Sequence, residues 1–365
     1  RGLQTCLWAP CGYVRPPDYT RKVIRTMSPV SEMALFATDQ ALAQAGLLGD
    51  PIVKGGRLGV AYGSCSGGVA ANADFYSVLM NREVRNVTSS TYIKMMSQTC
   101  AVNLSVHYGT TGRLLPTGTA CTSGSLAVGE AYEAIRYGAQ DVMIAGGAEE
   151  FSVTQVAVFD TLFATSRRND APETTPRAFD RDRDGLVIGD GAATLVLEEY
   201  GHARARGAAV LAEVVGFGTN TDGRHVTQPN AETMAVALKL ALDSAGLAPS
   251  DVGYVNAHGT ATDLGDIAEG TATAAVFGAA KPLVSTVKGY TGHTLGACGA
   301  IEAALTIEML RHGWFAPNLN LENPDPRCGE HDFVTGTGRA AETEFAMSDN
   351  FAFGGVNTSL VFRRT

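Results

Sequence analysis

The feature that most constrains the fold of this 365-residue chain is a repeated order of helix, strand and loop in its two halves. In each half a helical apolar pattern ends on Ala-Gly-Leu, and a short apolar strand then leads into a loop of small or polar residues. The first copy has a helix over 29–47, a strand over 58–62 and a loop over 63–68; the second has a helix over 231–245, a strand over 252–256 and a loop over 257–260.

A second matched pair of segments follows in the same order. A strand expected over 115–120 leads into a turn at Cys121 and a helix. Its counterpart is a strand expected over 283–287, which leads into the loop 288–293 and another helix. Chance similarity is the alternative, because Ala-Gly-Leu is a common helix ending, but the preserved order favours an internal duplication.

The duplication predicts an α/β fold in which each half holds a mostly parallel sheet between helices. The join is expected in the charged stretch 198–207, which gives an N-terminal half over 1–200 and a C-terminal half over 201–365. The long loop over 166–184, rich in charge, proline and threonine, is expected to border a site.

Composition excludes several classes of protein. The net charge is −9, with basic residues scattered apart from one N-terminal group, which argues against nucleic-acid binding. No apolar stretch approaches the ~18 residues needed to cross a bilayer, and residues 1–15 lack a signal-peptide core. The seven cysteines include no Cys-x-x-Cys pair, so we expect neither zinc nor a redox dithiol. We predict a cytoplasmic protein with reduced thiols.

Cys121 is the strongest candidate for a nucleophile. It lies in the run Pro-Thr-Gly-Thr-Ala-Cys-Thr-Ser-Gly-Ser at 116–125, directly before a helical pattern. A thiolate on such a turn faces unpaired backbone N–H groups and the positive end of the helix dipole, so we expect a lowered pKa. Free cysteine more commonly packs as a small apolar side chain, but the small polar neighbours here favour the functional interpretation.

Two histidines lie in loops that resemble the turn of Cys121. His258 follows an apolar strand in Asn-Ala-His-Gly-Thr, and His293 lies in the glycine-rich loop Lys-Gly-Tyr-Thr-Gly-His. Because parallel sheets place their sites at the carboxyl ends of strands, we expect both side chains to form a site with Cys121. The other histidines are interpreted as solvated or structural; His225 is the least certain, since Asp222 in its loop is placed to line an entrance.

Two further runs are open to more than one interpretation. Asp-Arg-Asp-Arg-Asp-Gly at 180–185 imitates a calcium loop, but the twelfth position is Gly191 and two arginines intrude, so we expect a charged turn held by its own Asp/Arg pairs. The run 349–357, Asp-Asn-Phe-Ala-Phe-Gly-Gly-Val-Asn, is either a core hairpin or a glycine-hinged aromatic gate whose backbone N–H helps to bind an oxyanion.

Taken together, these motifs resemble those of the β-ketoacyl-acyl carrier protein synthases, elongating condensing enzymes of thiolase-like fold. The resemblance rests on TACTSG at 119–124, RDRDG at 181–185 with GDGA at 189–192, NAHGT at 256–260, KGYTGHTLGA at 288–297 and NFAFGGVN at 350–357. It implies five layers, αβαβα, built from two duplicated halves with mixed, mostly parallel sheets.

The resemblance also implies roles for individual residues. Cys121 becomes the acyl acceptor, and His258 and His293 become the two active-site histidines. Lys288 matches the lysine five residues before His293, and Glu302 matches the helix carboxylate that supports it.

The same resemblance assigns the residues around the substrate. Phe353 matches the gating phenylalanine, and the backbone N–H groups of Cys121 and Phe353 form the implied oxyanion hole. Phe351 lines the malonyl pocket, while Thr260 and Thr262 match threonines that contact a phosphopantetheine arm.

The implied reaction is a decarboxylative Claisen condensation of malonyl-carrier protein with an acyl chain on Cys121, in fatty-acid or related polyketide or polyene biosynthesis. Neutral His258 and His293 donate Nε2–H bonds to the malonyl thioester oxygen, so loss of CO2 leaves a stabilised enolate. No metal or redox cofactor is implied, because the substrates arrive on the phosphopantetheine arm of acyl carrier protein.

Two kinds of partner are expected. Acyl carrier protein is acidic, so a basic patch of Arg21, Lys22, Arg25 and Arg85 is expected to dock it; the alternative is a solvated helix start. A homodimer is expected, because family members pair their sheets across an interface, and a heterodimer with a degenerate partner is the alternative.

Two departures from the family accompany the resemblance. Relatives open with a Val-rich strand carrying Val-Thr-Gly, whereas the printed sequence opens at Arg1-Gly-Leu-Gln, which indicates either truncation or a departure from its relatives. At the position that limits the acyl pocket this chain has Ser66 in place of a larger aliphatic residue, so we expect tolerance of longer, bent or polar acyl chains.

Neighbouring families fit the motifs less well. Thiolases use a second catalytic cysteine in a C-terminal Cys-x-Gly setting, where this chain has the aromatic and glycine residues 351–355. Initiating condensing enzymes have Asn where this chain has His293, and non-catalytic chain-length partner subunits lack the nucleophile that Cys121 provides. A non-catalytic partner subunit remains the alternative from a different class.

Overall fold

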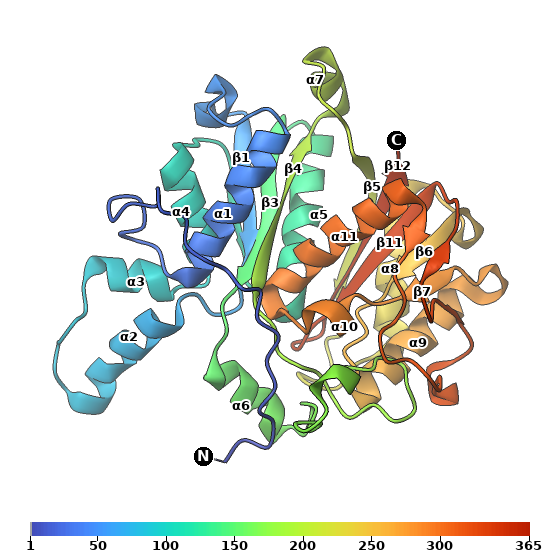
Figure 1. The fold of residues 1–365 in the computed structure, drawn as a ribbon. Helices are drawn as coiled ribbons and strands as arrows, with labels where there is room; N and C mark the ends of the chain where they lie inside the picture. Colours follow the sequence, from blue (N-terminus) through green and yellow to red (C-terminus); the bar gives the residue numbers. More distant parts are fainter. Residues whose placement is uncertain (1) are drawn as a thin grey trace.

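The computed structural model describes residues 2–365 and divides most of its strands between two sheets (Figure 1). The first sheet has the order β2-β1-β3-β4 and the second the order β5-β12-β11-β6-β7-β9. The strands of the first sheet are β1 (Leu58–Gly63), β2 (Leu114–Thr117), β3 (Val142–Glu149) and β4 (Gly191–Glu198). Those of the second are β5 (Ala212–Thr221), β6 (Val252–Asn256), β7 (Leu283–Ser285), β9 (Asp332–Phe333), β11 (Phe345–Phe351) and β12 (Val356–Arg364). A separate short pair joins β8 (Trp314–Phe315) to β10 (Arg339–Ala340).

The two sheets share one plan. In the first, β1 pairs in parallel with β2 and β3, and β3 pairs antiparallel with β4. In the second, β6 pairs in parallel with β7 and β11, and β11 pairs antiparallel with β12. The order β2-β1-β3-β4 is therefore repeated as β7-β6-β11-β12, as the internal duplication predicts, and both sheets are mixed. The division at residue 200 stays a prediction, although the four strands of the first sheet precede it and the six of the second follow it.

Helices form three layers, one between the two sheets and one on the outer face of each sheet (Figure 1). Helices α5 (Ser123–Arg136) and α11 (Cys298–His312) lie between the sheets, where they contact each other and strands of both sheets. Helices α1 (Pro29–Gln44) and α4 (Thr99–Tyr108) cover the outer face of the first sheet, and α8 (Ala231–Ala245) and α9 (Asp263–Phe277) cover that of the second. The other helices are α2 (Val69–Asn81), α3 (Ser89–Met95), α6 (Val153–Thr161), α7 (Tyr200–Ala205) and α10 (Lys288–Thr291).

Glycines let the two central helices approach closely at their N-terminal ends. A Cβ atom on Gly124 of α5 would lie 2.7 Å from the backbone nitrogen of Ala300, and one on Gly299 of α11 would lie 2.5 Å from that of Ser125. Both distances are too short for any side chain, so glycine is required on each side. The close approach brings the turns that precede α5 and α11 together at the centre of the protein.

Several predicted boundaries are wrong by a few residues. The strand expected over 115–120 ends at Thr117, because the backbone then turns and Ala120 adopts a left-handed φ of 51°. The strand expected over 283–287 ends at Ser285, before the helical turn α10. Both strands end where their partner strands end, since Thr117 pairs with Gly63 of β1 and Ser285 pairs with Asn256 of β6.

The run 180–185 forms only some of the ion pairs that were predicted for it. Arg177, which precedes it, pairs with Asp180, but the buried Arg183 binds outside the run, to Asp325 at 2.7 Å and to Asp266 at 3.6 Å. The expectation of a turn held by its own Asp/Arg pairs is wrong for Arg183, because burial of its guanidinium requires carboxylates from other segments. The run therefore fastens the loop 166–184 to the C-terminal half.

Among residues 2–365, no helix combines the length and the apolar character that crossing a bilayer requires.

Candidate active site

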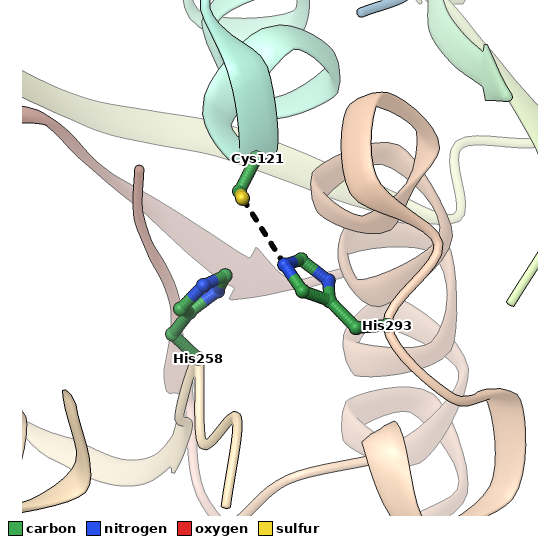
Figure 2. A group of neighbouring side chains, drawn as sticks. All are labelled: Cys121, His258 and His293. Carbon is green, nitrogen blue, oxygen red and sulfur yellow. Dashed lines mark hydrogen bonds between the residues drawn. The ribbon is translucent and has the colours of Figure 1, made fainter. Parts of the chain in front are cut away.

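Cys121, His258 and His293 meet at one point of the protein although they are far apart in the sequence (Figure 2). The Nε2 atom of His293 lies 3.1 Å from the Sγ atom of Cys121. The two imidazole rings are 5.1 Å apart between centroids and nearly perpendicular, at 87°. The structure thus brings together the three side chains that the sequence singled out.

The turn before α5 positions the thiol of Cys121. Ala120–Thr122 forms a short 3-10 turn between β2 and α5, and the left-handed φ of Ala120 sets its direction. Backbone N–H groups of Phe353 and of Cys121 itself lie beside the sulfur. These two N–H groups are the ones that the sequence assigned to an oxyanion hole.

The expected lowering of the Cys121 pKa is wrong. Burial, with the side chain only 4% exposed, raises the pKa of this thiol to about 11, although the Lys288 ammonium and the neighbouring backbone N–H groups act in the opposite direction. The loss of hydration of a thiolate in this apolar setting outweighs the helix N-terminus. In the resting protein the nucleophile is therefore a neutral thiol.

Both histidines are also neutral. Burial, and next the Lys288 ammonium, hold the pKa values of His258 and His293 well below their usual range. A neutral imidazole carries one N–H, so each ring has one donor and one acceptor nitrogen. This is the state that the enolate-stabilising role requires.

Lys288 and Glu302 form a buried ion pair beside His258. Burial is the largest single effect and disfavours the ammonium, but Glu302, Cys298 and Glu269 together outweigh it and raise the pKa of Lys288. The Nζ atom of Lys288 also lies 3.1 Å from Nδ1 of His258. The helix carboxylate and the lysine are thus placed in contact, as the sequence predicted.

A cavity of about 530 Å³ opens onto Cys121 and both histidines. Four of the residues assigned from the sequence also line it: Thr260, Thr262, Phe351 and Phe353. His225 and Asp222 line it as well, so the least certain of the histidines does lie beside the site.

The hairpin between β11 and β12 carries the expected gate residue. The ring of Phe353 packs against Phe159 of α6, with centroids 5.0 Å apart and the rings tilted by 36°. Gly354 and Gly355 follow with positive φ angles of 90° and 74°, and the Gly354 N–H donates to the carbonyl of Val226. The segment is a hairpin of the second sheet, and its role as a gate stays a prediction.

Cys298 is a buried thiol beside the nucleophile turn. It lies at the start of α11, where its thiol donates to the backbone carbonyl of Cys121 at 3.1 Å. Burial raises its pKa well above the usual value. Cys298 thus helps to hold the nucleophile turn and stays protonated, unlike the base of a thiolase.

Three buried residues of the site were not assigned roles from the sequence. Glu269 of α9 accepts from the backbone N–H of His258 at 2.6 Å, and Glu149 at the end of β3 accepts from that of Gly296 at 3.1 Å. The amide of Asn350 lies 3.2 Å from Nδ1 of His258. In the sequence, each of these residues stands out only as a carboxylate or amide at a strand end or on an apolar helix. Their hydrogen-bond partners become apparent only in the folded structure.

Seven of the assigned residues do not line the cavity: Lys288 and Glu302 lie behind His258, and the other five lie elsewhere. The Ser66 hydroxyl is 3.4 Å from a Glu149 oxygen and accepts from the Gln155 amide at 3.0 Å. The basic residues are exposed and lie on the surface: Arg21, Lys22, Arg25 and Arg85. Of these four, only Arg85 forms an ion pair within residues 2–365, with Glu83 at 2.7 Å.

Within residues 2–365, only two groups of side chains are arranged as metal ligands would be, and both lie in the active site. Cys121, His258 and His293 form one such group, and His258, Cys298 and Glu302 form the other. In the first group His293 contacts Cys121, and in the second Lys288 contacts both His258 and Glu302.

Five alternating layers with a cysteine and two histidines on strand-end loops define a thiolase-like condensing enzyme. A model of the β-ketoacyl synthase N-terminal domain matches residues 17–203, and one of the β-ketoacyl synthase C-terminal domain matches residues 211–322. The 3-oxoacyl-[acyl-carrier-protein] synthase 2 of Vibrio cholerae is 41% identical over 356 residues, 94% of this chain and 84% of that protein. The chain belongs to the β-ketoacyl synthase family.

Solved structures agree with this assignment. The crystal structure of a β-ketoacyl synthase from Burkholderia phymatum has a TM-score of 0.98 and 55% identity, covering all (100%) of this chain and 90% of that one. A type II polyketide ketosynthase in complex with its acyl-carrier protein has a TM-score of 0.86 and 29% identity, covering 100% of this chain and 89% of that one.

Proposed function

We propose that this β-ketoacyl synthase holds an acyl chain on Cys121 and condenses it with malonyl-acyl carrier protein. The observation that carries the proposal is the meeting of the Cys121 thiol with two neutral imidazoles, His258 and His293, at the inner end of one cavity. A non-catalytic partner subunit would have no need for this arrangement.

In the first stage, Cys121 attacks the carbonyl of the acyl thioester. The backbone N–H groups of Cys121 and Phe353 stabilise the tetrahedral oxyanion, and the C–S bond to the carrier then breaks. The thiol proton passes to the leaving pantetheine sulfur. The products are acyl-Cys121 and free carrier thiol.

In the second stage, the malonyl thioester oxygen lies between His258 and His293. The C–C bond to the carboxylate breaks, CO2 leaves, and the electron pair forms an enolate that the two Nε2–H groups stabilise. The enolate carbon attacks the acyl-Cys121 carbonyl, and the C–S bond breaks to release a β-ketoacyl thioester. The displaced Cys121 thiolate takes up one proton from water, so the condensation consumes one proton overall.

The proposal extends to cofactors and partners. Every step moves protons and electron pairs between groups already named, so no metal or redox cofactor takes part. Acyl carrier protein is the proposed substrate carrier, supported by the relatives' names and by the carrier complex of one of them. The exposed Arg21, Lys22 and Arg25 are its proposed docking site, and the assembly is proposed to be a homodimer.

The test is intact-mass detection of the acyl adduct, coupled to measurement of CO2 release from malonyl-carrier protein. Wild type should gain one acyl group and Cys121→Ala none. Cys100→Ala, which removes a buried thiol outside the cavity, is the matched control and should still be acylated. Absence of an adduct on wild type would overturn the proposal.

A further inference from the structure

Two hydrogen-bond donors converge on one nitrogen of His258. The Lys288 ammonium lies 3.1 Å and the Asn350 amide nitrogen 3.2 Å from Nδ1. Neither nitrogen has a lone pair to offer, so Nδ1 must be the acceptor nitrogen of the neutral ring. The ring proton is therefore on Nε2.

Both donors are anchored on the same carboxylate. Lys288 binds Oε1 of Glu302, and the Asn350 amide nitrogen donates to Oε2 at 2.6 Å. A carboxylate only accepts, so it fixes which way the amide of Asn350 faces; the reverse orientation would set two oxygens against each other. Glu302 thus holds both donors toward His258.

The position of Asn350 leaves little room for adjustment. It lies at the end of β11, between β12 and β6, and it pairs with Thr358 in the antiparallel ladder. Asn350 is fully buried, while Lys288 and Glu302 are each 1% exposed. Water cannot readily replace a lost donor in such a site, so the side chain at this position decides what Nδ1 meets.

In the N-terminal half, the residue equivalent to Asn350 accepts a hydrogen bond instead of donating one. Gly63, the last residue of β1, pairs with Gly147 of β3, and Asn256, the last residue of β6, pairs with Ser348 of β11. Glu149 and Asn350 each lie two residues beyond these pairs and therefore correspond to each other. Glu149 accepts a hydrogen bond from the backbone of Cys65, whereas Asn350 donates to the side chain of His258. The donor is thus found in the half whose histidine must have a fixed tautomer.

We propose that Asn350 is a positioning residue that, together with Lys288, selects the Nε2–H tautomer of His258. The inference rests on the proposed role of His258 in stabilising the malonyl enolate. Its consequence is specific to one half-reaction: decarboxylation needs the Nε2–H donor, whereas transfer of the acyl group to Cys121 does not.

Two substitutions of nearly equal size separate this role from a merely structural one. Asn350→Asp puts two carboxyl groups together, so a proton is shared with Glu302, and the oxygen that replaces Nδ2 faces His258 as an acceptor, which moves the ring proton to Nδ1. Asn350→Leu removes the hydrogen bonds but leaves the Lys288 donor in place. Asn103→Asp, a change at another buried amide that does not line the cavity, controls for the cost to folding of a new buried carboxyl group.

Each variant is tested for acyl-adduct formation, for CO2 release from malonyl-carrier protein and for the ¹⁵N chemical shifts of its histidine rings. Asn350→Asp should lower CO2 release by about 10²-fold, the usual effect of losing one oxyanion donor, and should interchange the His258 nitrogen shifts. Asn350→Leu should lose less, and both should form the acyl adduct. Equal loss in the two variants, equal loss of both half-reactions, or unchanged shifts in Asn350→Asp would overturn the inference. Failure of wild type in either assay would instead reject the proposed function.

Discussion

The Nε2 atom of His293 lies 3.1 Å from the sulfur of Cys121, yet the two groups do not form an ion pair. Burial raises the pKa of the thiol to about 11 and holds that of the imidazole well below its usual value, so both are neutral in the resting protein. A neutral pair avoids the cost of separated charge in a dry site.

Alkylation of Cys121 should accelerate with rising pH. Because the thiol pKa is about 11, the thiolate fraction and the iodoacetamide rate should increase roughly tenfold per pH unit between about pH 7 and about pH 9. The Cys121→Ala variant supplies the background from the exposed Cys6 and Cys11. A rate that levels off below neutral pH would instead indicate an ionised cysteine.

Removal of the buried lysine should impair both stability and chemistry. Lys288→Met leaves the Glu302 carboxylate unpaired, so the free energy of unfolding should fall by about 3 kcal/mol. The variant also loses a donor to His258, so CO2 release should fall by about 10²-fold. Adding Glu302→Gln should restore denaturant stability but not CO2 release. Recovery of both in the double variant would contradict the assigned role of Lys288.

Asp349 should make stability decrease as pH rises. Burial raises its pKa from an ordinary 3.8 to about 7, and its Oδ2 atom has no hydrogen-bond partner. Between these values the folded state keeps a proton that the unfolded state loses, so this group's contribution is complete below pH 3.8 and is lost by about pH 7. The free energy of unfolding that is lost between pH 3.8 and about pH 7 is about 4 kcal/mol at most.

Urea unfolding of Asp349→Asn at a series of pH values checks this prediction. Asparagine does not ionise, so the difference in unfolding free energy between variant and wild type should shift in favour of the variant as pH rises over that interval. A difference that is independent of pH would show that Asp349 titrates normally in the folded protein.

Ser66→Ile should shift the acyl preference toward shorter chains. The small hydroxyl is tied to Glu149 and Gln155, and a branched aliphatic side chain would add volume there. Acylation rates with thioesters of increasing chain length measure the effect. Ser66→Ala separates the loss of the hydroxyl from the added volume and should keep the wild-type preference. An unchanged profile in Ser66→Ile would remove this residue from the acyl pocket.

Charge reversal at Arg21 and Lys22 should weaken docking of acyl carrier protein. Both side chains are exposed, and neither forms an ion pair within residues 2–365, so their charge is available to an acidic partner. The double Glu variant should lose activity with carrier-bound substrate but retain acylation by a small thioester. Lys239→Glu, an exposed change on α8, should leave both unaffected. Equal loss of both activities in the double variant would refute the docking role.

The sequence by itself determined the architecture and the reacting groups. Its repeated order of helix, strand and loop predicted two equivalent sheets, and the loops after matched strands predicted that Cys121, His258 and His293 would meet. These features are local, because a turn, a strand and the helix behind it are set by neighbouring residues. Strand ends were less predictable, since β2 and β7 stop where pairing with Gly63 and Asn256 of their partner strands stops.

Only the tertiary structure decided the protonation states and the supporting contacts. The turn before α5 predicted a lowered pKa for Cys121, but burial of the thiol between the two halves raises it instead. Asn350 and Glu302 are 48 positions apart in the sequence, and their contact exists only because β11 and α11 pack together. Desolvation and hydrogen bonding between distant segments depend on the complete packing of the chain, which no local pattern encodes.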